Sequence, residues 1–198
     1  MSYANTKSAR EIWLEEGYRQ FAEHGPDNLS IKKISDTVGS SRASFYHHFG
    51  DIDVFTEELL AMHWNIVDDF NQKGKIICTQ LFPDLYNLLA KYSLPLQFNI
   101  QLFHHRNNPA FNFLFIKTYE SSAKTFLLRL FADRYSLHKP ESEIYDLWLM
   151  VGEAWYSRIN KDDLSAATLQ KHAEEIMNAV VKFANSQLYY AMKVQNSF

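Results

Sequence analysis

Apolar residues recur at helical spacing along most of the chain, and nowhere does the sequence alternate with the two-residue period of a strand. Over residues 8–24, for example, Trp13 and Phe21 fall on one side of a helix, and the pair Gly25-Pro26 ends it. The chain has only 6 Gly and 5 Pro among 198 residues, so few turns interrupt its helices. The sequence therefore predicts an all-helical protein.

Two short helices with a glycine between them follow this first helix. Ser30 is a suitable N-cap for one of them, and Gly39 ends it. A serine after Gly39 caps the second, in which Phe45 and Phe49 lie four residues apart on one face. Two short helices joined in this way are typical of a helix-turn-helix, which places its second helix in the major groove of DNA. The same pattern would also arise in two short helices that only pack together.

The helices that follow are longer and begin at recognisable capping residues. Asp51 caps a helix that is expected to run to about residue 73, where Gly74 can close it in the left-handed conformation. Asn108-Pro109 opens another helix that is apolar around most of its circumference, so we expect it to lie inside its domain. Further helices are predicted over residues 84–92, 95–105 and 140–159, and from about 165 past 183.

The outward face of the second short helix carries groups that can bind DNA. If its two phenylalanines point inward, six polar side chains are left to point outward: Ser41, Arg42, Ser44, Tyr46, His47 and His48. An arginine can donate two parallel hydrogen bonds to guanine, and a serine reaches either base edges or phosphates. Tyrosine and histidine can donate to phosphate oxygens, which fix the position of a helix on DNA. We therefore predict double-stranded DNA as a partner.

Three segments of the sequence carry a resemblance to a known family. They are FAEHG at residues 21–25, SIKKIS at 30–35, and GSS leading to FYHHF at 39–49. Together, over roughly residues 9–60, they resemble the amino-terminal domain of the TetR family of bacterial transcriptional regulators. The resemblance implies a three-helix DNA-binding domain, assigned here to residues 1–52, and a larger helical domain for ligand binding and dimerisation over 53–198.

The resemblance also implies a mode of action. Members of the family are homodimeric repressors whose second short helices enter successive major grooves of a near-palindromic operator, and a small-molecule effector releases them. Carried over to this chain, the base-reading positions are Arg42, Ala43 and Ser44, the phosphate contacts are Tyr46 and His48, and Lys32 reaches a base edge or the backbone. We expect a repressor that is released by a hydrophobic or aromatic effector.

One position departs from the family pattern. Family members usually carry a lysine that grips phosphate three residues after the position of Phe49, where this chain has Ile52 between two aspartates. The first 60 residues also hold six basic against ten acidic side chains. Both features favour an alternative, a helical ligand carrier or protein-interaction module of the same fold that has lost specific DNA binding.

Aromatic residues are unusually frequent, with 15 Phe, 11 Tyr and 4 Trp in the chain. This number exceeds what the core of a plain helical bundle requires, so some of these side chains are candidates to line a cavity for the effector. An aromatic stripe at helical spacing is, however, more often part of an ordinary core. The candidate pocket residues are Trp64, Phe98, Phe103, Phe115, Tyr119, Trp148 and Trp155.

Two helices in the carboxyl-terminal part carry apolar seams with spacings of three and four residues. Two such seams on adjacent helices can pair with their copies across a two-fold axis and form a four-helix interface. Alternatively, both seams serve only the core of a single chain. The candidate residues of the homodimer interface are Ile144, Trp148, Val151, Trp155, Leu169, Ile176, Val180 and Phe183.

No arrangement of residues in the sequence points to catalysis. Cys78 is the only cysteine, which excludes a disulfide within the chain and a zinc site built from cysteines. The sequence lacks a His-Glu-x-x-His motif, a phosphate-binding glycine loop and a nucleophile elbow. We therefore expect no enzyme, and neither catalytic residues, nor a metal, nor a cofactor.

Nothing in the sequence suggests a membrane protein or a secreted one. No apolar run approaches the roughly 20 residues of a membrane helix, and the first thirty residues are charged where a signal peptide would be apolar. The net charge of −3 provides no general attraction to nucleic acids, so DNA binding would have to depend on local charge. We expect a cytoplasmic protein.

Overall fold

The computed structural model describes residues 7–195, and the side chains of residues 7–184. Within this range the chain forms ten α-helices, together with short 3-10 and π segments, and it contains no strand. The prediction of an all-helical protein is therefore confirmed. None of the described helices is long and apolar enough to cross a membrane.

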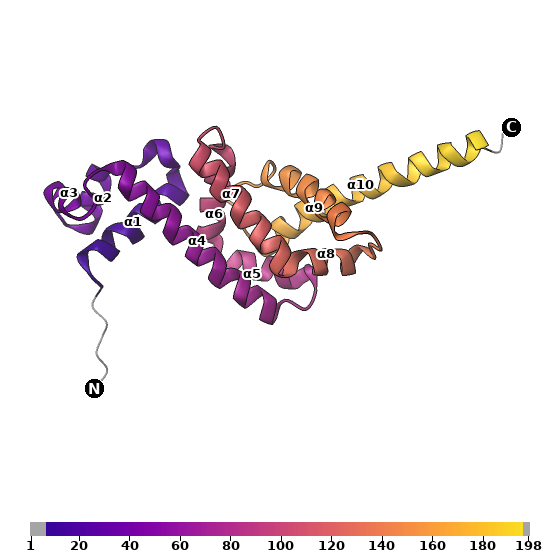
Figure 1. Cartoon of the computed structure of the whole chain (residues 1–198), viewed down its shortest axis with the longest axis horizontal. Helices are drawn as coiled ribbons and strands as arrows, with labels where there is room; N and C mark the ends of the chain where they lie inside the picture. Colours follow the sequence, from indigo (N-terminus) through magenta and orange to yellow (C-terminus); the bar gives the residue numbers. More distant parts are fainter. Residues whose placement is uncertain (1–6, 196–198) are drawn as a thin grey trace. The chain divides into compact units, whose positions relative to one another are not determined.

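The chain divides into two compact units, whose helices are labelled in Figure 1. The first unit comprises Met1–Ile76 and Tyr92–Thr125, and the second comprises Ile77–Lys91 and Phe126–Phe198. The first contains α1 (Ala9–His24), α2 (Ile31–Val38), α3 (Arg42–Phe49), nearly all of α4 (Ile52–Ile77), α6 (Ser93–His104) and α7 (Pro109–Ser122). The second contains α5 (Tyr86–Lys91), α8 (Leu128–Tyr135), α9 (Glu141–Tyr156) and α10 (Ala166–Gln195). The functional boundary predicted after residue 52 differs from this division and stays a prediction.

Large aromatic side chains form the core of the first unit. Five of them are fully buried: Trp13, Phe21, Phe45, Phe55 and Phe98. The ring of Phe98, on α6, stacks on that of Phe21, on α1, with 4.1 Å between the centroids. Among the helices of this unit, α1 has its most extensive packing with α6 and its next most extensive with α2. Helix α1 therefore lies between the pair of short helices and α6.

Gly17, on α1, leaves room for the ring of Phe55, on α4. A Cβ atom at this position would lie 2.2 Å from Cζ of Phe55, whose ring is fully buried. We predict that Gly17→Ala lowers the free energy of unfolding of the first unit by about 1–3 kcal/mol, because the ring has no room to move aside. Urea unfolding of the full chain measures this loss. Adding Phe55→Leu, which shortens the obstructing side chain, should recover part of it, and an unchanged stability of the single variant would contradict the packing described.

The core of the second unit lies where α9 and α10 meet. The indole Nε1 of Trp155, on α9, donates a hydrogen bond of 2.9 Å to the backbone oxygen of Leu169, on α10. Leu169 is fully buried, and the ring of Tyr86, on α5, lies 6.3 Å from that of Trp155. The pair α9–α10 is therefore fixed by a directional bond as well as by apolar packing.

The expected end of α4 at Gly74 is wrong. The helix continues to Ile77, and Gly74 lies inside it. Phe70 and Gly74 both lie on the buried face of α4, so packing of that face extends the helix past a residue of low helix propensity. Gly74 therefore does not mark a stop in this helix.

The expected interior position of α7 is also wrong. Phe113 is 67% exposed and Ile116 is 51% exposed, while Phe111, Leu114 and Phe115 face the core. The helix is therefore packed on one side only, and its apolar residues on the other side contact solvent in the single chain. The chain then passes through the π segment Ala123–Leu127 into α8, which the sequence pattern did not separate from α7.

Candidate nucleic-acid interface

Helices α2 and α3 form a helix-turn-helix in the first unit (Figure 1). Gly39 ends α2 with a φ of 66°, a left-handed conformation that favours glycine. The side-chain oxygen of Ser30 accepts a hydrogen bond from the backbone N–H of Lys33, and that of Ser41 accepts one from Ser44. The predicted cap and stop residues of this motif are therefore confirmed.

Two phenylalanines anchor α3 to the helices behind it. The ring centroid of Phe45 lies 5.3 Å from that of Trp13, on α1, and 5.1 Å from that of Phe55, on α4. The ring of Phe49 lies 4.8 Å from that of Phe55, and both anchoring side chains are buried. This packing fixes the rotation of α3 about its axis, so the opposite face of the helix is directed outward.

The outward face of α3 carries the side chains that the sequence predicted to contact DNA. Tyr46 is 54% exposed, so its hydroxyl is accessible to a partner. The exposed residues here are Ser41, Arg42, Ala43, Tyr46 and His47. Ser44 and His48 are half-buried, and Lys32, on α2, is exposed. All these residues are thus at least partly accessible, and their contact with DNA stays a prediction.

The basic side chains of this surface differ from those of α1 in their partners. On α1, Arg10 forms an ion pair with Glu58, and Arg19 forms ion pairs with carboxylates of its own helix. Within the described residues, neither Lys32 nor Arg42 forms an ion pair with a carboxylate. The positive charge of the first three helices is therefore available to a phosphate mainly on α2 and α3.

The start of α4 lacks the basic group that the family pattern places there. Ile52 is the first residue of α4 and is half-buried, and Asp53 beside it is exposed. The carboxylate of Asp51 accepts a hydrogen bond of 2.8 Å from the backbone N–H of Val54, so this aspartate caps α4 as predicted. The negative charge of Asp51 lies at the amino-terminal end of α4, where the positive end of the helix dipole partly compensates it.

The aromatic residues predicted to line a pocket pack against other side chains. In the first unit, Phe98 is fully buried, with its ring 4.3 Å from that of His63. Phe103 and Phe115 lie edge to face at 5.5 Å, and the guanidinium of Arg106 lies 4.1 Å from the ring centroid of Phe103. Such contacts are typical of an ordinary core. The sequence indicated this as the more frequent alternative to a pocket lining.

The remaining pocket candidates have comparable surroundings. The ammonium of Lys117 lies 3.7 Å from the ring centroid of Trp64, and Tyr119 stacks on Phe115 at 6.0 Å. In the second unit, Trp148 lies edge to face with Phe131 at 5.3 Å, and Trp155 is fixed by its bond to α10. The seven candidates thus divide between the two units, and their role as a pocket lining stays a prediction.

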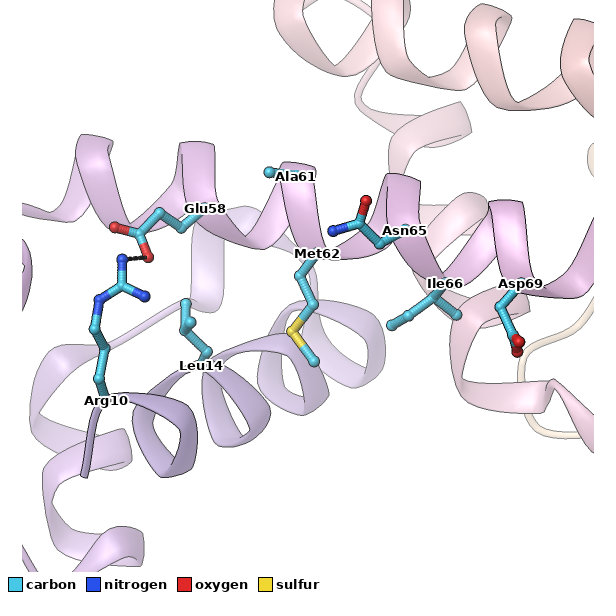
Figure 2. Close-up of a pocket in the computed structure, with 8 residues that line it drawn as sticks. All are labelled: Arg10, Leu14, Glu58, Ala61, Met62, Asn65, Ile66 and Asp69. Carbon is cyan, nitrogen blue, oxygen red and sulfur yellow. Dashed lines mark hydrogen bonds and ion pairs between the residues drawn. The ribbon is translucent and has the colours of Figure 1, made fainter. Parts of the chain in front are cut away.

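A groove that the sequence did not predict runs between α1 and α4 in the first unit (Figure 2). It has a volume of about 640 Å³ and is lined by Arg10, Leu14, Glu58, Ala61, Met62, Asn65, Ile66 and Asp69. Figure 2 shows Leu14 and Met62 between the two helices and the ion pair of Arg10 with Glu58 at one end. At the other end, the carboxylate of Asp69 pairs with Lys73 at 2.7 Å. None of the predicted pocket residues lines this groove.

The residues predicted to form a dimer interface lie mainly inside the second unit. Five are buried in the single chain, namely Ile144, Val151, Trp155, Leu169 and Ile176, while Trp148 and Val180 are half-buried. Phe183 alone among the eight is exposed, at 66%. Most of both seams therefore serves the core of one chain, the alternative that the sequence left open, and contact with a second copy stays a prediction.

Cys78 is buried in the second unit. Burial raises the pKa of the Cys78 thiol to about 11, with a smaller contribution from the nearby carboxylate of Asp84. The thiol is therefore protonated at neutral pH and is a poor nucleophile. Among the residues that the structure describes, no group of three or more histidine, cysteine, aspartate or glutamate side chains could hold a metal ion.

Sequence comparisons relate the helix-turn-helix part of the chain to known regulators. The family profile described as "Bacterial regulatory proteins, tetR family" matches residues 8–59. The HTH-type transcriptional repressor AcnR of Corynebacterium glutamicum is 44% identical over 46 residues, which are 23% of this chain and 24% of the relative. AcnR of Corynebacterium diphtheriae is 43% identical over 42 residues, which are 21% of this chain and 22% of the relative. The chain thus matches less than a quarter of the length of either relative.

Solved structures extend the likeness to most of the chain. A candidate transcriptional regulator from Saccharomonospora viridis, in complex with choline, has a TM-score of 0.64 and 17% identity over 86% of this chain and 95% of that one. A tetR-family transcriptional regulator from Streptomyces coelicolor has a TM-score of 0.56 and 17% identity over 84% of this chain and 78% of that one. At these identities the likeness concerns the fold, a helix-turn-helix domain followed by a larger helical domain. Residues 8–59 thus match the profile of the tetR family of bacterial regulatory proteins, and over the rest of the chain the likeness is one of fold.

Proposed function

We propose that the chain is a transcriptional repressor that binds a near-palindromic operator as a homodimer and is released by a small hydrophobic or aromatic effector. The observation that carries this proposal is the exposed face of α3, which presents the guanidinium of Arg42 without an ion pair among the described residues. Because Phe45 and Phe49 anchor the helix from behind, this face is held outward in the way that entry into a major groove requires.

The proposal assigns roles to residues of α2 and α3. Side chains at the start of α3 read base edges, and those further along bind the phosphate backbone, which sets the position of the helix without reading sequence. The base-reading residues are Arg42, Ala43 and Ser44, the phosphate-binding residues are Tyr46 and His48, Lys32 supports them from α2, and Ser41 and His47 lie beside them on the same surface.

A small-molecule effector and a homodimer are supported by separate observations. The regulator from Saccharomonospora viridis is in complex with choline, and the multidrug binding protein EbrR, with a TM-score of 0.52 and 12% identity, is in complex with imidazole. Two proteins of this fold thus hold small organic molecules. For the homodimer, α9 and α10 expose the apolar side chains of Met150, Val181 and Phe183, which a second copy can cover.

A second candidate function follows from the start of α4. Since Ile52 supplies no phosphate contact and aspartates flank it, DNA affinity is lower than with a lysine at this position. A helical ligand carrier or protein-interaction module would need no such contact. Selective DNA binding distinguishes the two functions, since only the repressor has it.

The change Arg42→Ala is expected to reduce binding to a preferred DNA sequence and to leave other DNA nearly unaffected. We take as the preferred sequence the duplex that purified protein selects from a random pool. Loss of paired hydrogen bonds to a guanine costs about 1–3 kcal/mol, which raises Kd roughly five- to 150-fold, on this duplex alone. Fluorescence anisotropy with the selected and the scrambled duplex measures both values. Equal losses on the two duplexes would mean that Arg42 does not read bases.

The change His48→Ala is expected to weaken binding to every sequence by a similar factor. A hydrogen bond to a phosphate oxygen contributes about 1 kcal/mol, so Kd should rise roughly fivefold on both the selected and the scrambled duplex. The same anisotropy measurement, carried out at one salt concentration, tests this. A loss confined to the selected duplex would assign His48 to base reading instead.

A further inference from the structure

A chain of hydrogen bonds crosses the interior of the first unit and joins four of its helices. The hydroxyl of Tyr18, on α1, lies 2.7 Å from Nδ1 of His63, on α4. The other ring nitrogen of His63, Nε2, lies 3.1 Å from Oδ1 of Asn99, on α6. The hydroxyl of Thr118, on α7, lies 3.3 Å from the same Oδ1 and 3.0 Å from the backbone oxygen of Phe115, so its one proton is shared between these two acceptors. Each bond in this chain connects residues on different helices.

Aromatic rings lie against this chain of hydrogen bonds. His63 is fully buried, and Tyr18 and Thr118 are buried as well. The ring of Phe98 stacks on Tyr18 at 4.5 Å and on His63 at 4.3 Å, with the planes inclined by less than 20°. Water therefore has little access to the polar atoms of Tyr18 and His63, and either of these two is left without a replacement when it loses its partner. Asn99 is half-buried.

The partners of His63 fix its protonation state. Oδ1 of Asn99 only accepts hydrogen bonds, so Nε2 of His63 must carry the proton that lies between them. Nδ1 is then free to accept the hydroxyl proton of Tyr18. Burial lowers the pKa of His63 to about 4, so the ring is neutral at pH 7 and this single tautomer satisfies both neighbours.

Helix α6 also holds α1 at a second point. The amide Nε2 of Gln101 donates a hydrogen bond of 3.2 Å to the backbone oxygen of Ala22, near the end of α1. Gly25, which follows α1, approaches Gln101 so closely that a Cβ atom would lie 2.8 Å from its Oε1. Helix α6 is therefore bonded directly to the end of α1 and, through His63 of α4, to its middle, in addition to the stacking of Phe98 on Phe21.

We propose that Tyr18, His63 and Asn99 are positioning residues through which α6 sets the orientation of α1 and of the helix-turn-helix packed on it. Hydrogen bonds are directional, so a shift of α6 must either carry α1 with it or break the chain inside the core. The network of hydrogen bonds thus has two discrete states, linked and broken. Helix α3 follows α1 because the ring of Phe45 packs on that of Trp13. This inference rests on the proposed function, for which it supplies the route from α6 to the DNA-binding face.

The route is tested by a double-mutant cycle on the full chain without DNA. Asn99→Ala breaks the chain at α6, and Tyr18→Phe breaks it at α1 while keeping the ring that stacks on Phe98. If the chain couples the helices, Asn99→Ala raises amide hydrogen-exchange rates in α1 at least fivefold when Tyr18 is present, and less than twofold in the Tyr18→Phe background. Equal effects in both backgrounds would overturn the proposal, since independent packing changes are additive.

A matched control separates coupling from a general loss of packing. Ser121→Ala removes the hydrogen bond of 3.2 Å from Asn71, on α4, to Ser121, on α7, which does not reach α1. Exchange in α1 should stay within twofold of the wild type in this variant. Nitrogen-15 NMR of the histidine ring supplies a second readout: the wild type should show His63 as the neutral tautomer protonated at Nε2, and the opposite tautomer would overturn the assignment.

DNA binding completes the test. On the duplex that the wild-type protein selects, Tyr18→Phe and Asn99→Ala should each raise Kd at least fivefold, and Ser121→Ala should raise it less than twofold. Equal losses in all three variants would overturn the proposed route. If the wild type selects no duplex, the proposed function fails, and the exchange cycle still decides whether the chain couples α6 to α1.

Discussion

Replacing Phe45 with alanine is expected to lower the free energy of unfolding of the first unit by about 3–5 kcal/mol. The ring is fully buried and lies against Trp13 from α1 and Phe55 from α4, so its removal leaves a cavity where three helices meet. These neighbours are themselves large rings held by other contacts, which limits how far they can fill the space. Urea unfolding of the full chain, followed by circular dichroism, measures the loss.

The matched control for this variant is Phe113→Ala, which removes the same side chain from an exposed position of α7. Its expected effect on stability is small, because the ring is already 67% exposed and leaves little cavity. Selective DNA binding should be lost in Phe45→Ala, since α3 loses its anchor, and kept in Phe113→Ala. Similar unfolding curves for the two variants would contradict the assignment of Phe45 to the core.

Acidification is expected to destabilise the protein through His63 by about 3 kcal/mol. In the unfolded chain the imidazole has the ordinary histidine pKa of 6.5, and burial lowers that pKa to about 4 in the folded protein. Above pH 6.5 both states are neutral and the group has no effect. Between pH 6.5 and 4 only the unfolded chain binds the proton, so stability falls steadily, and below pH 4 the loss stays constant.

The pH dependence is measured by urea unfolding between pH 7.5 and pH 4, the range over which stability is expected to fall. His63→Gln removes the titrating group, so the difference in slope between the wild type and this variant isolates the contribution of His63 from that of the carboxylates. A wild-type slope that His63→Gln leaves unchanged would mean that the ring is not buried in its neutral form.

Local features of the sequence predicted the helix-turn-helix closely. Ser30, Gly39 and Ser41 act through the backbone within a few residues, so their effect does not depend on the rest of the fold. The inward direction of Phe45 and Phe49 followed from helical periodicity for the same reason. The exposed face of α3, and with it the candidate DNA contacts, could therefore be predicted from the amino-acid sequence alone.

Features that depend on contacts between distant helices could not be predicted in this way. The groove between α1 and α4 is lined by Leu14, Met62 and Ile66, which are half-buried in the structure. In the sequence they are ordinary apolar residues of two helices and carry no sign of a groove. The chain from Tyr18 to Asn99 gives no local signal either, because each residue is polar or aromatic at a position that only tertiary packing buries.

Periodicity also cannot distinguish a seam that faces a partner from one that faces the same chain. Leu169 and Ile176 belong to a regular apolar seam, and both are buried within the second unit. The sequence shows which side of the helix is apolar, whereas the tertiary fold decides what covers it. Gly74 has a similar explanation, because packing of the buried face of α4 outweighs the local tendency of glycine to end a helix.

The most direct test of the central claim, that α3 reads DNA sequence, is selection of fragments of the source genome on the purified protein at about 150 mM salt. The control is Tyr46→Ala, since the side chain is exposed and its removal leaves the fold intact. We expect a short inverted repeat to be enriched by the wild type and lost in the variant. A folded wild-type protein that enriches no sequence would contradict the proposed function and favour a helical carrier or interaction module.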